Sequence, residues 1–181
     1  MDKTDARIVA LLQDNARLKN AELARQLGLA QSTVLERIRR LEEQGIIKGY
    51  MAVVDPRKLG LTVQALISVS LKSHEAESIL QFEDSIRKLP HVRACLHLTG
   101  RFDYILHVAV KDLDQLRSLI KNHIAALPGF GRSETFVIFA DIKDYQGYPV
   151  DADNYIESDN HQATDSGKPT TFKRLKAVKG G

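Results

Sequence analysis

Residues 23–47 read LARQLGLAQSTVLERIRRLEEQGII and contain two apolar patterns of helical period, separated by Gly28. The first pattern predicts a helix that is capped by Asn20 and ends at Gly28, because glycine readily takes the left-handed conformation that stops a helix. The second pattern begins at Gln31 and ends at Gly45. Two helices joined by so short a glycine-containing turn predict a helix-turn-helix.

A further helix is expected before this motif. Thr4 is a candidate cap, and Ile8, Leu11 and Leu12 follow it at helical spacing until the chain reaches Asn15. This helix would cover the apolar side that the next two share. The sequence therefore predicts a three-helix, helix-turn-helix domain over residues 1–49.

The helix that begins at Gln31 has two different faces. On a helical wheel its apolar residues Val34, Leu35, Ile38 and Leu41 fall on one side. Small polar residues at the start of such a helix can approach DNA bases, and arginines further along can reach guanine edges or phosphates. The candidate DNA-contacting residues are Gln31, Ser32, Thr33, Glu36, Arg37, Arg39 and Arg40. A solvated basic face, or a helical bundle that binds no DNA, would give the same pattern.

Charge and cysteine content narrow the class of protein. The net charge is +3, and residues 1–60 carry three more basic than acidic side chains, so the whole excess lies in the first third. This asymmetry favours an anionic partner for that part. The single cysteine, Cys95, is typical of a reducing cytoplasm. No apolar run reaches the roughly 20 residues of a membrane span, and no secretory signal is recognisable. We expect a cytoplasmic protein without membrane contact.

The pattern changes after the first domain. Residues 50–61 are predicted to form a linking strand, and residues 62–149 a second domain. Its elements are a strand at 63–71, a helix capped by Ser73 and closed by Pro90, strands at 92–98 and 102–110, a helix from Asp112 to Leu127, and a strand at 132–142. The order β-α-β-β-α-β predicts a ferredoxin-like antiparallel sheet, and thus an α+β fold class. Alternating apolar residues suggest that a second subunit covers the free sheet face.

Residues 150–181 are polar and are predicted to be a disordered tail. The tail ends in KRLKAVK, at positions 173–179. This basic stretch offers either additional phosphate contacts or an ordinary solvated end.

Two stretches resemble a known family. LARQLGLAQSTVLERIRRLEEQGIIKGY, at 23–50, resembles the DNA-binding domain of the Lrp/AsnC transcriptional regulators, and TGRFDYILHV, at 99–108, resembles their effector-domain signature. The resemblance runs from about Thr4 to Tyr148. It implies dimers formed through the ferredoxin-like sheets, further assembly into octamers or other discs, and an amino-acid effector bound near the turn before Tyr104. Residue by residue, it assigns effector contacts to Gly100, Asp103 and Tyr104, and DNA contacts to Gln31, Ser32, Thr33, Arg37 and Arg40.

The turn at 99–104 also has chemistry of its own. Gly100 would let the backbone approach a ligand closely, and Asp103 could receive an ammonium group. The alternative is a plain turn glycine beside an acid that stabilises a hairpin. Arg101 departs from the family, which often has an acid or another polar residue there; it would favour an acidic effector, bind a carboxylate, or remain solvated. The candidate effector-binding residues are Thr99, Gly100, Arg101, Asp103 and Tyr104.

Other functional classes find less support. Cys95, His97 and Asp103 could be drawn as a nucleophilic triad, but no oxyanion site accompanies them, and we expect no enzyme. The six histidines lack the spacing of metal ligands, and no phosphate-binding loop is present, so neither a metal nor a cofactor is predicted. The closest rival is a ligand-independent protein that packages DNA, because it shares every feature of the first half.

Overall fold

The computed structural model describes residues 1–143 and 146–150. The chain divides into two compact units: Met1–Ala52 together with the described residues after Lys143, and Val53–Lys143. Of the predicted disordered tail, only Val150 is described, so that prediction lies outside the described residues.

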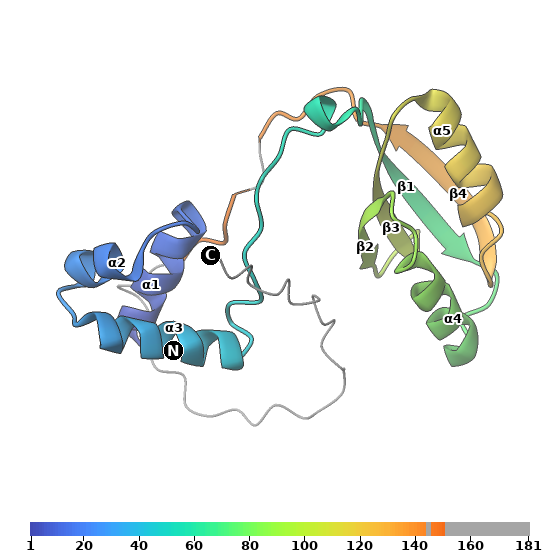
Figure 1. Ribbon diagram of the computed structural model, residues 1–181. Helices are drawn as coiled ribbons and strands as arrows, with labels where there is room; N and C mark the ends of the chain where they lie inside the picture. The colour runs from blue at the N-terminus through green and yellow to red at the C-terminus, as the bar shows by residue number, and fades with distance from the viewer. Residues whose placement is uncertain (144–145, 151–181) are drawn as a thin grey trace, which may run out of the picture. The chain divides into compact units, whose positions relative to one another are not determined.

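The first unit contains three helices, α1 (Lys3–Asp14), α2 (Asn20–Leu27) and α3 (Gln31–Glu43), as Figure 1 shows. Their buried contact residues are Ile8, Leu12, Leu23, Ala24, Val34, Ile38 and Leu41. The cap of α1 is Asp2 and not Thr4. The Asp2 carboxylate accepts the N–H of Asp5 at 2.8 Å, and the Asp5 carboxylate accepts the N–H of Asp2 at 3.2 Å. This reciprocal capping box satisfies two helix-end donors at once, which Thr4 could not do.

The turn between α2 and α3 follows the prediction. Gly28 has φ 67°, the left-handed conformation that ends α2. Asn20 is the first residue of α2, but its side chain is not the cap.

Leu35 was expected on the apolar side of α3, yet 56% of it is exposed. It lies about 60° around the helix from Ile38. That position places it at the margin of the buried stripe, where it lines a 280 Å³ pocket with Leu12 and Tyr50.

The segment between the two units differs from the prediction. Among the described residues, no strand lies between α3 and the sheet of the second unit; the segment holds a single 3-10 turn, η1 (Arg57–Leu59), closed by Gly60 at φ 78°. A strand needs a neighbour to accept its backbone hydrogen bonds. Within the described part of the chain, residues 50–55 share no backbone hydrogen bond with another segment, and the expected linking strand is not formed there.

The second unit is a four-stranded antiparallel sheet with two helical segments. The elements are β1 (Val63–Leu71), α4 (Ala76–Ile86), β2 (Val92–His97), β3 (Tyr104–Val110), α5 (Leu113–Ser118), its continuation η2 (Leu119–Ile124), and β4 (Phe130–Val137). The strand order is β2-β3-β1-β4, which is the ferredoxin-like arrangement. Asp112 caps α5 as predicted. Ser73 does not cap α4; it accepts the N–H of Glu75, which is the N-cap residue.

The helices α4 and α5 cover one face of the sheet (Figure 1). That face provides alternate residues of β1 and β3 to the core, where they meet Phe82 and Ile86 of α4 and Leu116 of α5. The opposite face, here called the open face, carries apolar side chains in adjacent pairs: Leu96 beside Ile105, and Leu66 beside Phe136. Leu66 is 36% exposed, Leu96 56% and Phe136 52%. The helices therefore leave an apolar surface on the far side of the sheet.

The described residues after Lys143 contact α1. The side-chain amide of Gln13 donates to the carbonyl of Tyr148 at 2.9 Å and accepts the N–H of Tyr148 at 2.7 Å. A Cβ on Gly147 would meet Gln13 at 2.6 Å. One amide thus binds both backbone groups of Tyr148, and a larger residue in place of Gly147 would require Gln13 to move.

Candidate DNA-binding helix and effector turn

The polar face of α3 is exposed as predicted. Gln31, Ser32, Thr33, Glu36, Arg39 and Arg40 are all exposed. The helix begins after Ala30 without a side-chain cap, and its first turn holds no acid. The free N–H groups and the positive end of the helix dipole at this terminus favour an anion such as a phosphate. This end of α3 is therefore suited to approach the DNA backbone and base edges.

Arg37 and Arg40, two of the candidate DNA contacts, are paired with acids at the start of α1. Arg37 donates to Asp2 at 2.6 Å and to Asp5 at 2.7 Å, and Arg40 donates to Asp5 at 2.7 Å. The Asp5 side chain is 2% exposed, Arg37 25% and Arg40 48%. These contacts join α3 to the start of α1. Among the described residues, the third arginine, Arg39, forms its ion pair with Glu43 on its own helix.

The charges in this cluster are mutually stabilised. Burial alone would raise the pKa of Asp2, but the hydrogen bond from Arg37 and those from backbone N–H groups outweigh it, so its pKa lies below the ordinary value. The bond to Asp2, together with that to Asp5, raises the pKa of Arg37. Two acids offset two arginines, so this part of the basic face carries no surplus charge. Helical periodicity gave no sign that Asp2 and Asp5 bind the arginines of α3, because these arginines lie more than thirty residues away in the sequence.

The effector turn connects β2 to β3. The N–H of Leu98 donates to the carbonyl of Asp103 at 2.8 Å, and the N–H of Asp103 donates to Val69 on β1 at 3.0 Å. Gly100 has φ 137°, a conformation that side-chain-bearing residues rarely adopt. A Cβ built on Gly100 would meet no atom of the described part of the chain within 4 Å. Glycine is required here by the backbone conformation, and the space beside it is open to a ligand.

The carboxylate of Asp103 fixes the ends of two strands. Its Oδ2 accepts the N–H of Leu71 at 2.7 Å, and its Oδ1 lies 2.9 Å from Nε2 of His74. Burial favours the neutral acid, but the bonds from Leu71 and His74 outweigh it and hold the pKa of Asp103 below its ordinary value. The acid is therefore ionised at neutral pH, as an ammonium partner must be. His74 was not among the candidate residues.

Arg101 forms an ion pair and is not simply solvated. Its guanidinium donates to Glu134 of β4 at 2.9 Å and lies 5.0 Å from the ring centroid of Phe102. Because β1 lies between β3 and β4 in the sheet, the Arg101–Glu134 pair spans β1 on the open face. Ser70 of β1 has a buried Oγ without a hydrogen-bond partner among the described residues. Thr99 is exposed in the same turn.

Tyr104 belongs to the core and not to the surface of the turn. It is 1% exposed, its hydroxyl donates to Glu83 of α4 at 3.1 Å, and its ring stacks on His97 with centroids 4.5 Å apart. Burial and the bond to Glu83 raise the pKa of its hydroxyl. Tyr104 therefore positions the start of β3, and its ring is not available to a ligand beside Gly100.

The residues of the hypothetical nucleophilic triad are not arranged for nucleophilic chemistry. Cys95 is exposed as a residue, but partial desolvation of its sulfur and the charge of Glu83 raise the pKa of the thiol to about 11, so it stays protonated at neutral pH. His97 lies 3.6 Å from Glu83, and Asp103 bonds His74 instead. A protonated thiol is a poor nucleophile.

Comparison with known proteins finds one family model for each half of the chain. A family model described as the Lrp/AsnC ligand binding domain matches residues 64–148, and one described as winged helix-turn-helix DNA-binding matches residues 1–48. The transcriptional regulator AldR of Mycolicibacterium smegmatis is 39% identical over 143 residues, covering 79% of this chain and 84% of that protein. The leucine-responsive regulatory protein of Escherichia coli is 33% identical over 143 residues, covering 79% and 87%.

Solved structures show the same fold. A transcriptional regulator of Neisseria meningitidis in complex with L-Met superimposes with a TM-score of 0.76 at 32% identity, over 82% of this chain and 96% of that one. A helix-turn-helix unit joined to a ligand-binding unit defines a DNA-binding transcriptional regulator. The chain belongs to the Lrp/AsnC family. Its relatives are regulators rather than enzymes, and no helix among the described residues is long and apolar enough to cross a membrane.

Proposed function

We propose that an amino acid bound at the turn Thr99–Asp103 changes the DNA affinity of this regulator. The observation that carries the proposal is the pairing of an ionised carboxylate, Asp103, with an open glycine, Gly100, in one short turn. An amino-acid zwitterion needs a partner for its ammonium and donors for its carboxylate. The related regulator from Neisseria meningitidis, whose structure contains L-Met, supports an amino acid as the ligand class.

Each residue of the turn has a proposed role. Asp103 receives the ammonium, and Arg101 binds the carboxylate by exchanging Glu134 for it. This exchange is feasible because the Arg101 side chain is 69% exposed, and exposed ion pairs contribute little free energy. Thr99 contributes a hydroxyl, and Gly100 allows the ligand to come close to the backbone. Tyr104 acts through the core by holding β3 in place.

The first unit is proposed to bind DNA through the start of α3. In a helix-turn-helix, the N-terminal residues of the second helix contact base edges in the major groove. Gln31, Ser32 and Thr33 hold that position. Arg39 is assigned to phosphate contacts, with Glu36 beside it. Arg37 is assigned to the contact that holds α3 against α1. Arg40, which is half exposed, is assigned both to this contact and to phosphate contacts.

Dimerisation is proposed to occur through the open face of the sheet. Its exposed apolar residues, Leu66, Leu96 and Phe136, lie on three different strands and form the kind of surface that a subunit interface buries. A twofold dimer would place two α3 helices on half-sites about one helical turn apart. Octamers or other discs follow from the family resemblance alone.

The first experiment is thermal denaturation of the full chain with each of the twenty amino acids, with oligomer size measured alongside. A ligand that binds only the native state raises stability by mass action, so a hit requires no knowledge of the operator. One amino acid that stabilises the wild type, but not Asp103→Ala, would support the proposal. If none of the twenty changes stability or oligomer size, amino-acid gating is refuted, and the ligand-independent architectural role becomes the better account.

A further inference from the structure

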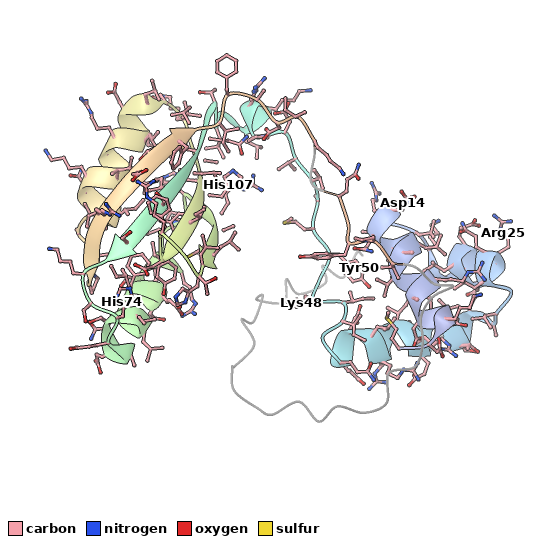
Figure 2. The ribbon with its side chains drawn as sticks, turned by 180° about the vertical axis from the view of Figure 1, so that it is seen from behind. Asp14, Arg25, Lys48, Tyr50, His74 and His107 are labelled. Carbon is pink, nitrogen blue, oxygen red and sulfur yellow. The ribbon has the colours of Figure 1, made fainter. Side chains whose placement is uncertain are left out.

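His74 lies in the loop between β1 and α4, beside the carboxylate that the proposed function assigns to the effector ammonium. Its Nε2 is 2.9 Å from Oδ1 of Asp103. Figure 2 labels His74 next to α4. Its side chain is 67% exposed, whereas that of Asp103 is 21% exposed. The imidazole is therefore by far the more exposed member of the pair.

The other oxygen of Asp103 is already used within the fold. Oδ2 accepts the N–H of Leu71, the last residue of β1. That donor belongs to the sheet backbone and cannot move away without loss of the strand end. Only Oδ1 has a partner that can leave, because its bond comes from an exposed side chain on a loop. An arriving ammonium therefore finds His74 in the place that it must take.

We propose that His74 and the ammonium of the effector compete for Oδ1 of Asp103, so that His74 sets the pH range in which the effector binds. This inference rests on the proposed function. A histidine side chain changes charge between about pH 5 and 8. The protonated imidazole is a cation and competes with a second cation, whereas the neutral ring offers only an ordinary hydrogen bond. Effector affinity is thus lowest in mild acid and rises toward pH 8.

Other charged and titratable groups lie in the same loop and on β2. Lys72 and Glu75 flank His74 in its loop. His97 on β2 also acts on the charge of Asp103. However, Nδ1 of His97 lies 3.6 Å from Glu83 of α4, and its ring stacks on Tyr104. His97 is therefore the matched control: a second nearby histidine whose imidazole faces a different acid.

The test is calorimetric titration of the full chain with L-methionine and with L-leucine, at several values between about pH 5.5 and 8. In the wild type, affinity should rise about tenfold over this range, as expected for loss of one competing cation. His74→Ala should bind the amino acid more tightly than the wild type at the acid end of the range. Its affinity should change less than threefold between the lowest and the highest pH, which is roughly 0.6 kcal/mol. His74→Gln, which keeps a donor without a charge, should also lose the pH dependence. His97→Gln should retain the wild-type slope.

The outcomes separate the two proposals. If the wild type binds but His74→Ala keeps the same pH slope, or His97→Gln abolishes it, the inference about His74 is wrong while amino-acid gating stands. If neither amino acid binds any of the proteins at any pH, the inference falls together with its premise for these ligands. 4-(Methylthio)butanoate, which lacks the ammonium, provides a further check. A gain in its affinity in His74→Ala equal to that of L-methionine would contradict competition for Asp103.

Discussion

Replacing Arg37 should loosen the first unit, whereas replacing Arg39 should not. Arg37→Ala removes two charged hydrogen bonds, one to Asp5, whose side chain is 2% exposed, and one to Asp2, whose side chain is 40% exposed. Arg39→Ala removes one bond to Glu43 in which both side chains are more than 60% exposed. The two substitutions delete the same side chain from the same helix, so helix propensity changes equally.

The expected magnitudes follow from burial. Leaving a buried carboxylate with no partner costs about 3–5 kcal/mol. Arg40 and the N–H of Asp2 still bond Asp5 in the variant, so the expected loss for Arg37→Ala is smaller, about 2 kcal/mol. An exposed pair within one helix contributes little to stability, so Arg39→Ala should cause a much smaller loss. Arg37→Ala is therefore predicted to be clearly the more destabilising of the two variants.

Amide hydrogen exchange of the full chain, read by mass spectrometry on peptides from α1 and α3, measures this difference within one unit. Arg37→Ala should accelerate exchange in both helices, while peptides from the sheet remain unchanged. Equal exchange in the two variants would refute the assignment of Arg37 to the join between α1 and α3, and would return it to the DNA-contacting residues.

Three further predictions concern other parts of the chain. Gly100→Ala should lower stability by about 1–3 kcal/mol, seen in thermal denaturation, because φ 137° strains any other residue; an unchanged melting temperature would mean that the turn relaxes. Because the folded pKa of Asp103 is lowered, its contribution to stability is present above its unfolded value near 3.8 and is lost as the pH falls below it. Asp103→Asn should therefore flatten the acid limb of stability against pH, and a steeper limb would contradict this. Gln13→Ala should speed proteolysis near Tyr148 with little effect on the melting temperature, and unaltered cleavage would show that the contact does not protect the segment.

The order of elements was predictable because each leaves a local signal. Apolar spacing of helical period marks the three helices, alternation marks the strands, and Gly28 and Gly45 end two helices at φ 67° and 69°. The core position of Tyr104 also had a signal. It shares its alternation with Leu106 and Val108, which face the helices, and this could have excluded it as a surface residue.

Contacts between distant residues were not predictable from local patterns. Asp5 and Arg37 meet because α1 and α3 pack against each other, and a helical wheel of α3 alone places Arg37 on a solvated flank. The same limit applies to His74. It bonds Asp103 from the loop before α4, and no sequence motif links that loop to the turn at Gly100. Leu35 was misplaced for a different reason: the edge of an apolar stripe is a continuous angle, and no sequence rule fixes where burial stops.

The most direct test of amino-acid gating is the DNA affinity of the full chain with and without ligand. Fluorescence anisotropy would follow binding to a duplex that the protein itself selects from random sequence, with each amino acid that raised thermal stability. The wild-type affinity should change by about 5–150-fold, the usual range of allosteric coupling. Asp103→Ala should bind the same duplex but lose the response. Equal DNA affinity in the presence and absence of every amino acid that raised thermal stability would contradict the account.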